Sequence, residues 1–600
     1  MASDHEVEVR FFPGALNIPL DTPRLYLYFK EGHLMKFIIV SGGVMSGLGK
    51  GTISASLSFL LKSQGYKVTP VKIDVYFNVD AGTLRPQEHG EVFVTHDGME
   101  TDEDLGHYER FIHQNLRREN YVTAGQVYGE IIRRERAFEY AGETVDVIPH
   151  VTDEIIRRIK LAGAVNNSEI VIVEFGGTVG EYKNGIFYEA TRILDFKEPE
   201  NVIQLHVTYF PYLANVGELK SKPAQTSVHI LNGMGIQPDI IVARSVKPID
   251  RKRLEKLALY TNVKPEYIFS APDMSNIYEV PLLLSNSGKG LDDTCLSLLG
   301  LKPRKHTLLT SWRKLLKSIK KKKEKTLKIA MVGKYFVTGD YRLADSYISV
   351  IEALRHAAWK LGSDVKPFWI DSEDLENKKA NLEGFDGIIV PQGWGARGTE
   401  GKISAAKFAR ENKIPYLGLC FGMQMATIEF ARNVLNLKKA NTTEADPKTP
   451  HPVIHIMPDQ KEYLSKRQYG GTIRLGAWPC IVKKGSKLEE AYLKYGSVKK
   501  APWYEENSLQ SKGRPKNGKL LVFERHRHRF EFNNKYRAKY EKNGFIFSGT
   551  SPDGKLVEAI EITNHPFFLG TQFHPEYISR PLTPHPLFIS FVEAVIKLKP

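Results

Sequence analysis

The sequence predicts an α/β protein with two domains, each built around a parallel β-sheet. Short apolar runs rich in Val and Ile recur along the chain and alternate with longer amphipathic stretches. Continuous apolar strands separated by helices are typical of parallel sheets covered on both faces. A lysine-rich stretch interrupts this alternation near the middle of the chain. Each half also contains a glycine-rich corner, which is a strand-to-helix turn that carries a reactive or charged side chain.

Two series of apolar runs predict the strands. In the first half, an amphipathic stretch over 54–65 predicts the helix that follows the first strand and its glycine turn. The strands expected in that half lie at 37–43, 67–74, 169–177, 202–209 and 239–245. Those expected in the second half lie at 328–335, 387–393, 414–420 and 569–577.

The same pattern predicts the domain boundaries. Residues 1–35 are an N-terminal extension, 36–301 the first domain, 302–326 a basic linker and 327–600 the second domain. The linker reads KPRKHTLLTSWRKLLKSIKKKKEKT, which could hold one basic helix but is best interpreted as a connection. The stretch 496–519 is rich in Gly, Pro, Ser and Lys and is expected to be a surface loop.

Composition excludes several classes of protein. The chain of 600 residues has only three cysteines (Cys295, Cys420 and Cys480), which excludes a disulfide framework and indicates a reducing compartment such as the cytoplasm. It has no C-x-x-C pair, so a thiolate zinc site is not expected. No apolar run approaches the roughly 20 residues that span a bilayer, and 1–34 lack the apolar core of a signal peptide.

The net charge of +15 raises the question of nucleic acid. Much of the excess lies in lysine-rich segments such as 317–325, which lack the interleaved aromatic residues of a base-stacking surface. Positive charge also suits a protein that handles polyanionic nucleotides. Neither nucleic acid nor a membrane is therefore expected as a partner.

The glycine-rich corner of the first half is SGGVMSGLGKGT at 41–52. After a strand and before a helix, successive N–H groups can surround a triphosphate, and Lys50 can neutralise its outer phosphates. The spacing differs from the standard P-loop, because five residues separate Gly43 from Gly49 and Gly51 stands where Ser or Thr is usual. An ordinary tight turn is the alternative, and the strand, the GKG and the helix together favour a phosphate site.

Acidic residues follow the strands of the first half. Lys72 and Asp74 lie at one predicted strand end and Glu174 at another, and ETDEDLGHYER at 100–110 adds further carboxylates. Carboxylates beside a phosphate loop suit nucleotide-bound Mg²⁺, which takes few protein ligands. The alternative for the 102–104 carboxylates is a solvated loop.

The corner of the second half is PYLGLCFGMQMA at 415–426, which places Cys420 between two glycines. A lone buried cysteine is usually a small hydrophobic residue. Here FHPEY supplies His574 and Glu576, and PQGWGARG at 391–398 supplies a glycine-rich turn. Amide hydrolysis needs a thiolate, a base, a group that orients the base, and N–H donors for the oxyanion. Cys420, His574 and Glu576 meet the first three needs, and the helix N-terminus after Cys420 favours the thiolate.

From about residue 36 to the C-terminus the sequence resembles the CTP synthase family, glutamine-dependent enzymes that aminate UTP. In the first half the resemblance rests on GGVMSGLGKG, NVDAGT, HGEVFVTHDGMETDEDLGHYERF, VIPHVTDEI, GGTVG and KSKPAQTSV. The second half looks like a class I glutamine amidotransferase domain, on GLCFGMQ and FHPEY. The fold implied is a P-loop-type synthetase domain with a parallel sheet, fused to a class I glutamine amidotransferase α/β domain.

The resemblance implies a carbon–nitrogen ligase of pyrimidine biosynthesis. ATP would phosphorylate O4 of UTP, ammonia would attack C4, and phosphate would leave. The resemblance further implies Mg²⁺, ATP as co-substrate, GTP as an allosteric activator, and a homotetramer (a dimer of dimers) that in some members stacks into filaments.

Residue roles in the first half are implied by the matching motifs. The ATP site would comprise Ser46, Gly47, Leu48, Gly49, Lys50, Gly51, Lys72 and Asp104. Asp104 and Glu174 would bind the metal. The UTP or CTP site would comprise Ser46, Glu181, Lys220, Lys222 and Gln225. His89 and Val92 match the part of the family near the ammonia passage, and His150 falls in its IPH motif.

In the second half the resemblance implies a catalytic triad of Cys420, His574 and Glu576. The glutamine site would comprise Gly393, Phe421, Gln424, Glu444 and Arg527, with the guanidinium of Arg527 on the substrate α-carboxylate. The oxyanion donors would be N–H groups near 392–393 and at Phe421.

Two departures from the family carry consequences. The turn that usually reads Gly-Gly-Phe-Gly begins here with Gln392. If that position needs a positive φ, glutamine would cost about 1–2 kcal/mol and weaken the glutaminase. In GGTVGEYKN at 176–184, Lys183 reverses the sign of a position associated with the product, and the hypothesis is that feedback inhibition by CTP is altered or lost.

Three interpretations remain open at this point. The first is an active member of the family. The second is a divergent member whose main role is assembly. The third is another P-loop amidotransferase, such as a cobyrinate-type synthetase, which gives no reason for HGEVFVTHDG or KSKPAQ.

Overall fold

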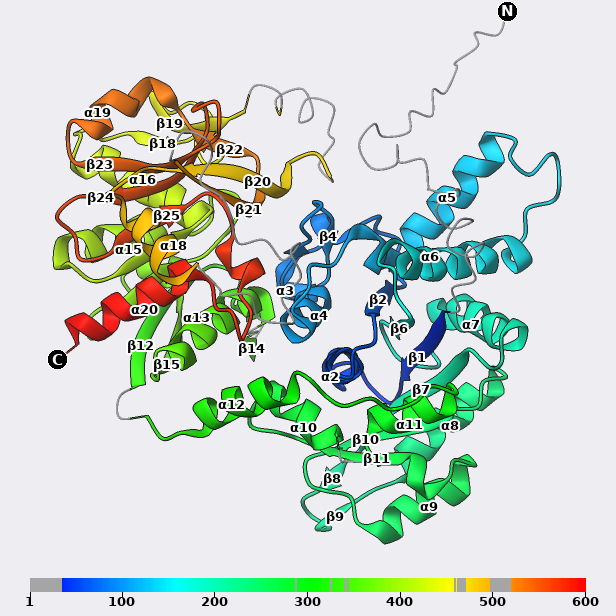
Figure 1. The fold of residues 1–600 in the computed structure, drawn as a ribbon. Helices are drawn as coiled ribbons and strands as arrows, with labels where there is room; N and C mark the ends of the chain where they lie inside the picture. The colour runs from blue at the N-terminus through cyan, green and yellow to red at the C-terminus, as the bar shows by residue number, and fades with distance from the viewer. Residues whose placement is uncertain are drawn as a thin grey trace, which may run out of the picture.

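The structure, a computed structural model, describes residues 35–285, 289–323, 326–338, 341–342, 345–457, 460, 471–496 and 519–599. The predicted extension 1–35 lies outside the described residues except for Met35, and so does almost all of the predicted loop 496–519. Two α/β bodies lie side by side, the first half of the chain in blue to green and the second in green to red (Figure 1).

The first body is built on a seven-stranded sheet in the order β11-β10-β7-β1-β6-β2-β5, in which neighbouring strands pair in parallel. The strands are β1 (Lys36–Gly42), β2 (Val68–Asp74), β5 (Tyr121–Thr123), β6 (Ile170–Phe175), β7 (Val202–Phe210), β10 (Ile240–Ser245) and β11 (Ile268–Pro272). All five strands predicted in this half are confirmed. Both faces of the sheet are covered, because alternate residues of β1 enter different cores: Ile38 and Val40 face one, Phe37 and Ile39 the other.

Helices cover both faces. α2 (Lys50–Ser63) and α4 (Asp104–Ile112) pack in the first core. α5 (Ala124–Arg136), α6 (Thr152–Val165) and α7 (Gly185–Lys197) pack in the second. The helices α8 (Lys222–Gly233) and α9 (Arg251–Thr261) complete the body beside β10.

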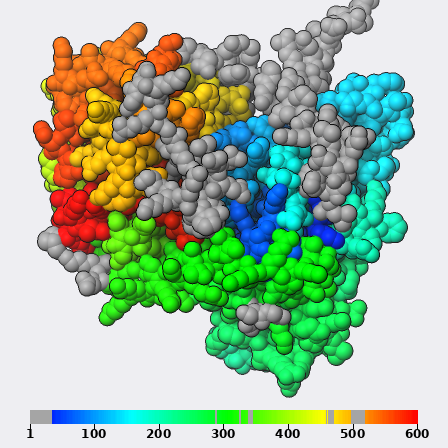
Figure 2. Space-filling model, viewed as in Figure 1, coloured from blue at the N-terminus to red at the C-terminus, as the bar shows by residue number. Residues whose placement is uncertain are grey.

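The predicted linker contains a core helix. α12 (Leu309–Lys320) buries one face, Leu309, Trp312, Leu315 and Leu316, in the first core of the first body. Trp312 is fully buried, and its Nε1 donates to the carbonyl of Tyr278 at 2.8 Å. The green segment forms a continuous band across the lower part of the molecule, above a teal-green lobe (Figure 2). The stretch 302–326 is therefore more than a connection, and the exact boundaries of the domains stay a prediction.

The second body is built on a nine-stranded sheet in the order β15-β12-β16-β17-β25-β24-β23-β20-β21. Its parallel part comprises β12 (Thr326–Gly333), β15 (Asp364–Asp371), β16 (Gly387–Val390), β17 (Tyr416–Leu419) and β25 (Phe568–Thr571). Its antiparallel part comprises β20 (Arg474–Val482), β21 (Leu520–His528), β23 (Phe545–Thr550) and β24 (Val557–Ile562). The four strands predicted in this half are confirmed, whereas the antiparallel extension was not predicted.

The sheet places the chemistry of the second half at one edge. α16 (Phe421–Asn433) follows β17, and α13 (Ile348–Lys360), α15 (Thr399–Asn412) and α20 (Pro586–Leu598) pack around the sheet. β17 pairs with β25 in parallel, with Leu419 opposite Thr571. Because parallel strands end at the same edge, the residues that follow them, Cys420 and His574, come together across a sequence gap of more than a hundred residues.

The two bodies touch through the segment around α3 (Pro86–His89), α4 and β4 (Glu100–Thr101), which lies between them in Figure 1. Arg525 of β21 is fully buried there and donates to the carbonyl of Val94 at 2.9 Å and to Glu109 of α4. Among the described helices, none has both the length and the apolar character needed to cross a bilayer.

Candidate active sites

The phosphate turn of the first half is built from backbone. Gly47 and Gly49 have φ of 71° and 82°, a region that glycine enters without strain. Gly49 is the N-cap of α2 and offers no side chain to the first N–H groups of the helix, which leaves them available to an anion. Lys50 is buried, and its Nζ donates to the carbonyl of Gly177 at 2.6 Å. The predicted turn, GKG and helix are therefore present.

A buried cation and three carboxylates lie beside this turn. Lys72 of β2 forms an ion pair with Asp104, and its Nζ lies 3.3 Å from Glu174 Oε1 and 4.0 Å from Asp74 Oδ1. Lys72 is paired in register with Glu174 on β6, which explains how residues about 100 positions apart meet. Burial opposes the charge on Lys72, but Asp104 and Glu174 outweigh it and raise the pKa of the ammonium well above its usual value.

The carboxylates respond to the same surroundings. Burial raises the pKa of Glu174 and of Asp74, and Lys72 only partly offsets it. For Asp104 burial acts in the same direction, but Lys72 prevails and the pKa is lowered. The three carboxylates therefore place several oxygen atoms where a cation could bind, and the ammonium of Lys72 neutralises part of their charge.

The position of Asp104 explains why residue 51 is glycine. A Cβ on Gly51 would collide with Asp104 Oδ1, so the carboxylate occupies the space of the usual Ser or Thr side chain. Among the described residues no group of three or more His, Cys, Asp or Glu forms a complete metal cage. Mg²⁺ on a nucleotide needs only one or two protein carboxylates, and Asp104 with Glu174 fits that requirement.

The residues predicted for UTP or CTP border the phosphate turn. Lys222 and Gln225 lie in the first turn of α8, and a Cβ on Gly43 would touch Ser227 of that helix at 2.5 Å. Glu181 accepts from the N–H of Thr178 at 2.7 Å in the loop after β6.

Two lysines of the first body, Lys220 and Lys183, have acidic partners. Lys220 forms an ion pair with Glu218. Lys183 lies 3.6 Å from Glu181, and its side chain is 55% exposed. The positive charge of Lys183 is therefore in part compensated by the neighbouring carboxylate.

Cys420 lies on a strained corner between β17 and α16. Its φ of 51° and ψ of −100° are outside the ordinary regions for a residue with a side chain. The flanking glycines are required by close approach: a Cβ on Gly422 would collide with the carbonyl of Val390, and one on Gly418 would lie 2.8 Å from the Gly422 carbonyl carbon. The Cys420 N–H donates to the carbonyl of Thr571 at 2.6 Å. The corner holds the thiol at the start of α16, where four N–H groups lack helical partners.

His574 and Glu576 complete the predicted constellation. His574 Nδ1 lies 2.8 Å from Glu576 Oε1, and the imidazole stacks on Tyr577 with ring centroids 4.9 Å apart. Burial opposes protonation of His574, but Glu576 and Cys420 raise the pKa of the imidazole to about 10. His574 Nε2 makes no hydrogen bond of ordinary geometry to a described residue, while the thiol lies close enough to act on the ring electrostatically. The arrangement favours the protonated form of His574.

The oxyanion turn is unstrained at Gln392. Gln392 is absent from the residues with positive φ, so the condition under which it would weaken the turn is not met. The left-handed residue is Gly395, with φ of 74°. The N–H groups of Trp394 and Gly395 donate to Tyr335 Oη at 2.9 Å and to Glu444 Oε1 at 2.6 Å.

One cavity of about 290 Å³ unites the predicted residues of the second half. It is lined by Gln392, Gly393, Trp394, Cys420, Phe421, Gln424, Glu444, Arg527, His528, Arg529, Phe530 and His574. All five residues predicted to bind glutamine are therefore in contact with the same cavity as the nucleophile.

Arg527 links this cavity to the first body. Its Nε donates to Glu100 Oε1 of β4 at 2.8 Å, and its NH2 to the carbonyl of Gly82 at 3.3 Å. Burial opposes the charge, but Glu100 prevails and raises the pKa of the guanidinium. The sequence predicted that Arg527 belongs to the glutamine site, but it did not predict the ion pair with Glu100.

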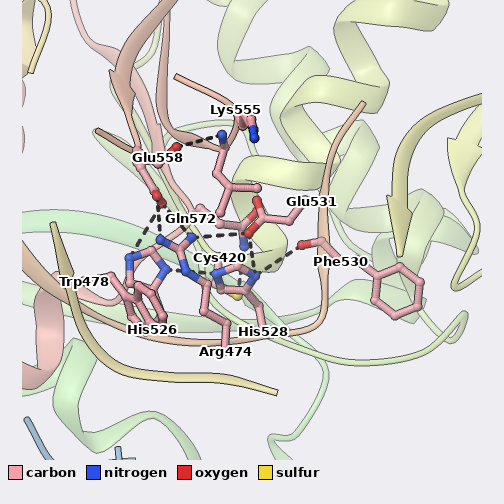
Figure 3. A network of polar contacts seen from close by, with 12 residues as sticks. Cys420, Arg474, Trp478, His526, His528, Phe530, Glu531, Lys555, Glu558 and Gln572 are labelled. Atoms are coloured by element: carbon pink, nitrogen blue, oxygen red, sulfur yellow. Dashed lines mark hydrogen bonds and ion pairs between the residues drawn. The ribbon is translucent and has the colours of Figure 1, made fainter. Parts of the chain in front are cut away.

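A buried polar network lies beneath Cys420 (Figure 3). Gln572 Nε2 donates to Cys420 Sγ at 3.5 Å. Arg474 pairs with Glu558 at 2.7 Å and with Glu531 at 3.3 Å. His526 Nδ1 lies 2.9 Å from His528 Nε2. Burial, reinforced by Arg474, lowers the pKa of both imidazoles well below the usual value. The basic run at 524–530 is thus an interior support of the site, and is not a nucleic-acid surface.

The predicted passage residues have different environments. Val92 is buried, and its carbonyl accepts from Tyr577 Oη at 3.0 Å. The ring of Tyr577 in turn stacks on His574. His89 is exposed and lies edge-on to Tyr76. His150 lies on a surface turn, where its Nδ1 accepts from the Asp146 N–H at 3.0 Å. Its ring also lies edge-on to Tyr140 and 3.6 Å from the carboxylate of Glu143.

Several neighbours of the sites were missed by sequence reasoning: Glu91, Glu100, Lys334, Lys402, Gln572 and Tyr577. They lie on segments far apart in the sequence and have no spacing pattern of their own. Only the tertiary fold brings them to the cavity or its supports.

Comparison with known proteins agrees with this geometry. The family model described as "CTP synthase N-terminus" matches residues 36–301, and that described as "Glutamine amidotransferase class-I" matches 342–594. A CTP synthase of Sulfurisphaera tokodaii is 51% identical over 567 residues, covering 94% of this chain and 99% of that protein. The chain belongs to the CTP synthase family.

A second CTP synthase supports the assignment. One from Halalkalibacterium halodurans is 47% identical over 565 residues, again covering 94% of this chain and 99% of that protein. A solved structure described as Trypanosoma brucei CTPS glutaminase domain with bound acivicin is 36% identical, covers 45% of this chain and 94% of that chain, and has a TM-score of 0.37. As a member of the CTP synthase family, the protein is a glutamine-hydrolysing ligase with a synthetase and a glutaminase half.

Proposed function

We propose that the protein aminates UTP to CTP beside the phosphate turn, with ammonia that it releases from glutamine at Cys420. The observation that carries this proposal is the single cavity that joins Cys420, His574 and every residue predicted to bind glutamine. Arg527, which lines that cavity, is hydrogen-bonded to Glu100, on the segment that leads to Asp104 at the phosphate turn. The assembly-only alternative gives no reason for a nucleophile held at a strained corner.

Glutamine hydrolysis follows from the geometry of the second half. Cys420 Sγ would attack the amide carbon, and His574 would give its proton to the departing nitrogen. Glu576 holds Nδ1, which directs Nε2 toward the reacting atoms. The N–H groups of Phe421 and Gly393 would stabilise the oxyanion, and Gln424, Glu444 and Arg527 would hold the amino acid. Water would then release glutamate from the thioester.

UTP activation requires mainly position and charge. The N–H groups of the turn from Ser46 to Gly51 would bind the ATP phosphates together with Lys50, and Lys72 would neutralise charge on the transferred phosphoryl group. Asp104 and Glu174 would bind Mg²⁺, which would neutralise negative charge on the phosphates. Ser46, Glu181, Lys220, Lys222 and Gln225 would bind the pyrimidine nucleotide.

Ammonia would pass between the two sites along the contact of the bodies. Val92 is hydrogen-bonded to Tyr577, which stacks on His574, so the segment that contains Val92 begins next to the triad. His89 lies three residues earlier on that segment.

We also propose GTP as an activator, a cytoplasmic location and a homotetramer. The three described cysteines are free and buried, which suits a reducing compartment. Support for assembly comes from large apolar side chains exposed on α5 and on the segments around it: Phe77, Ile132, Phe138, Val147 and Ile148.

The test is CTP formation from UTP, ATP and Mg²⁺, once with glutamine plus GTP and once with ammonium chloride. We expect the native protein to make CTP from both sources and Cys420→Ala to make it from ammonium only. Product from ammonium alone in the native protein would contradict the glutaminase half. No product from either source would favour the assembly role.

A further inference from the structure

Gln392 joins the two bodies at the oxyanion turn. Its Nε2 donates to Glu91 Oε1 at 3.3 Å, although the residues are 301 positions apart. Both are buried, with 9% and 3% of their surfaces exposed. Burial raises the pKa of Glu91 to about 7, and in its ionised form the carboxylate can only accept, so that Nε2 is the atom that faces it. The family resemblance implies glycine at this position, and glycine has no side chain to make this contact.

The Glu91 end of the contact is fixed to the second body. The N–H of Ser349, in α13, donates to Glu91 Oε2 at 3.0 Å. The N–H of Glu91 itself donates to the carbonyl of Asp345 at 3.1 Å. The next residue, Val92, accepts from Tyr577. A segment of the synthetase half is therefore docked on the glutaminase half at three successive points.

The Gln392 end is fixed from behind. Lys402 of α15 is fully buried, and its Nζ donates to the carbonyls of Pro391 at 2.8 Å and Gln392 at 3.2 Å. Tyr347 Oη donates to the same Gln392 carbonyl at 3.3 Å. With its carbonyl held, the backbone of Gln392 cannot turn without breaking these bonds. Gly393, the proposed oxyanion donor, is the next residue.

We propose that Gln392 is a positioning residue that couples the two active sites: its bond to Glu91 holds the oxyanion turn in its working geometry only while the 90–94 segment of the synthetase half is docked. Glutamine would then be hydrolysed at full rate only in the docked state, in which the passage beside Val92 is formed. The inference deepens the proposed function and rests on Cys420 as the nucleophile.

The test is a swap of the two side chains. Gln392→Glu sets two carboxylates face to face. In the double variant Gln392→Glu with Glu91→Gln, the amide introduced at position 91 can donate to the carboxylate introduced at position 392, while its carbonyl oxygen accepts from Ser349. For each variant, glutamine-dependent CTP formation is divided by ammonium-dependent CTP formation, and glutamate released per CTP is measured. A hydrogen bond to a charged group sets the expected loss in Gln392→Glu at about tenfold or more in kcat.

We expect the double variant to recover to within about threefold of the native ratio, because the bond is rebuilt with its polarity reversed. We also expect more glutamate per CTP in the single variant than in the native protein. Gln392→Met, which keeps the volume without the bond, serves if Gln392→Glu does not fold, and should lose severalfold. A single variant within twofold of native, or a double variant as slow as Gln392→Glu, would overturn the inference. A native protein inactive with glutamine but active with ammonium would instead contradict the proposed role of Cys420.

Discussion

The two active regions use the same strand-to-helix corner in opposite ways. At the phosphate turn the strain-free left-handed positions are glycines, and residues 44–47 are exposed. At the nucleophile corner the left-handed residue is Cys420 itself, only 4% exposed. The first corner offers N–H groups to a charged ligand, whereas the second holds one reactive atom in place.

The difference follows from the chemistry. Phosphoryl transfer needs little covalent help from the protein, so charge and position are sufficient. Amide hydrolysis needs a nucleophile in one orientation, and a buried, strained corner provides it. Electrostatics differ likewise: Lys72 faces three carboxylates, whereas His574 faces one carboxylate and one thiol. The predictions below test whether the two regions can be disabled separately.

The largest effect is expected for Lys72→Ala. It removes the cation from the buried carboxylates and from the transferred phosphoryl group, so CTP formation should fall at least about a thousandfold with either nitrogen source. Loss of one partner of a buried ion pair should also destabilise the fold by about 3–5 kcal/mol. Rates with both sources and thermal unfolding check this. Lys197→Ala, at an exposed lysine of α7, is the matched control.

Glu576→Gln should affect only the glutaminase half, by about a hundredfold in glutamine hydrolysis. His574 supplies a proton while its ring is charged, which holds below its pKa of about 10. Because Glu576 raises that pKa, its neutralisation should move the alkaline limb of the hydrolysis profile to lower pH. A limb at the same pH in both proteins would contradict the assigned role of Glu576.

Gly51→Ser should lower CTP formation about tenfold with either nitrogen source. The added side chain collides with Asp104 Oδ1 and displaces a proposed metal ligand. Gly129→Ala in α5 is the control, because a Cβ there meets no atom within 4 Å. A dependence on Mg²⁺ concentration identical to that of the native protein would show that Asp104 had not been disturbed.

Lys183→Glu should have the smallest effect. Lys183 is half exposed beside Glu181, and exposed charge pairs contribute less than about 1 kcal/mol. Restoring an acidic residue should strengthen inhibition by CTP about two- to fivefold. Inhibition curves that coincide for the two proteins would remove Lys183 from any role in feedback.

Much of the fold was predictable because apolar periodicity marks buried parallel strands directly. β1, β7 and β17 fall where the runs predicted them. The antiparallel strands β20 and β21 were missed, because their buried side includes charged residues such as Arg525, whose partner Glu109 belongs to the other half. The sequence suggested α12 only as an alternative to a linker. The many lysines of this stretch obscure the apolar side chains, Trp312 among them, that the helix buries in the core.

The candidate sites were predictable where a motif fixes chemistry locally, as around Lys50 and Cys420. They were not predictable where residues of one half complete the site of the other half. Glu91 and Glu100 come from the synthetase half, yet they contact Gln392 and Arg527 at the glutaminase cavity. No spacing within either half encodes these contacts. They exist only after the two bodies dock.

The most direct test of the account is the fate of the glutamine amide nitrogen. The native protein would make CTP from glutamine labelled with ¹⁵N in the amide, in the presence of unlabelled ammonium chloride below saturation. The account predicts that most of the CTP carries ¹⁵N, because ammonia passes from Cys420 to the synthetase site without mixing with solvent. Label diluted to the isotope ratio of the bulk ammonia would contradict the claim that the two regions work as one enzyme.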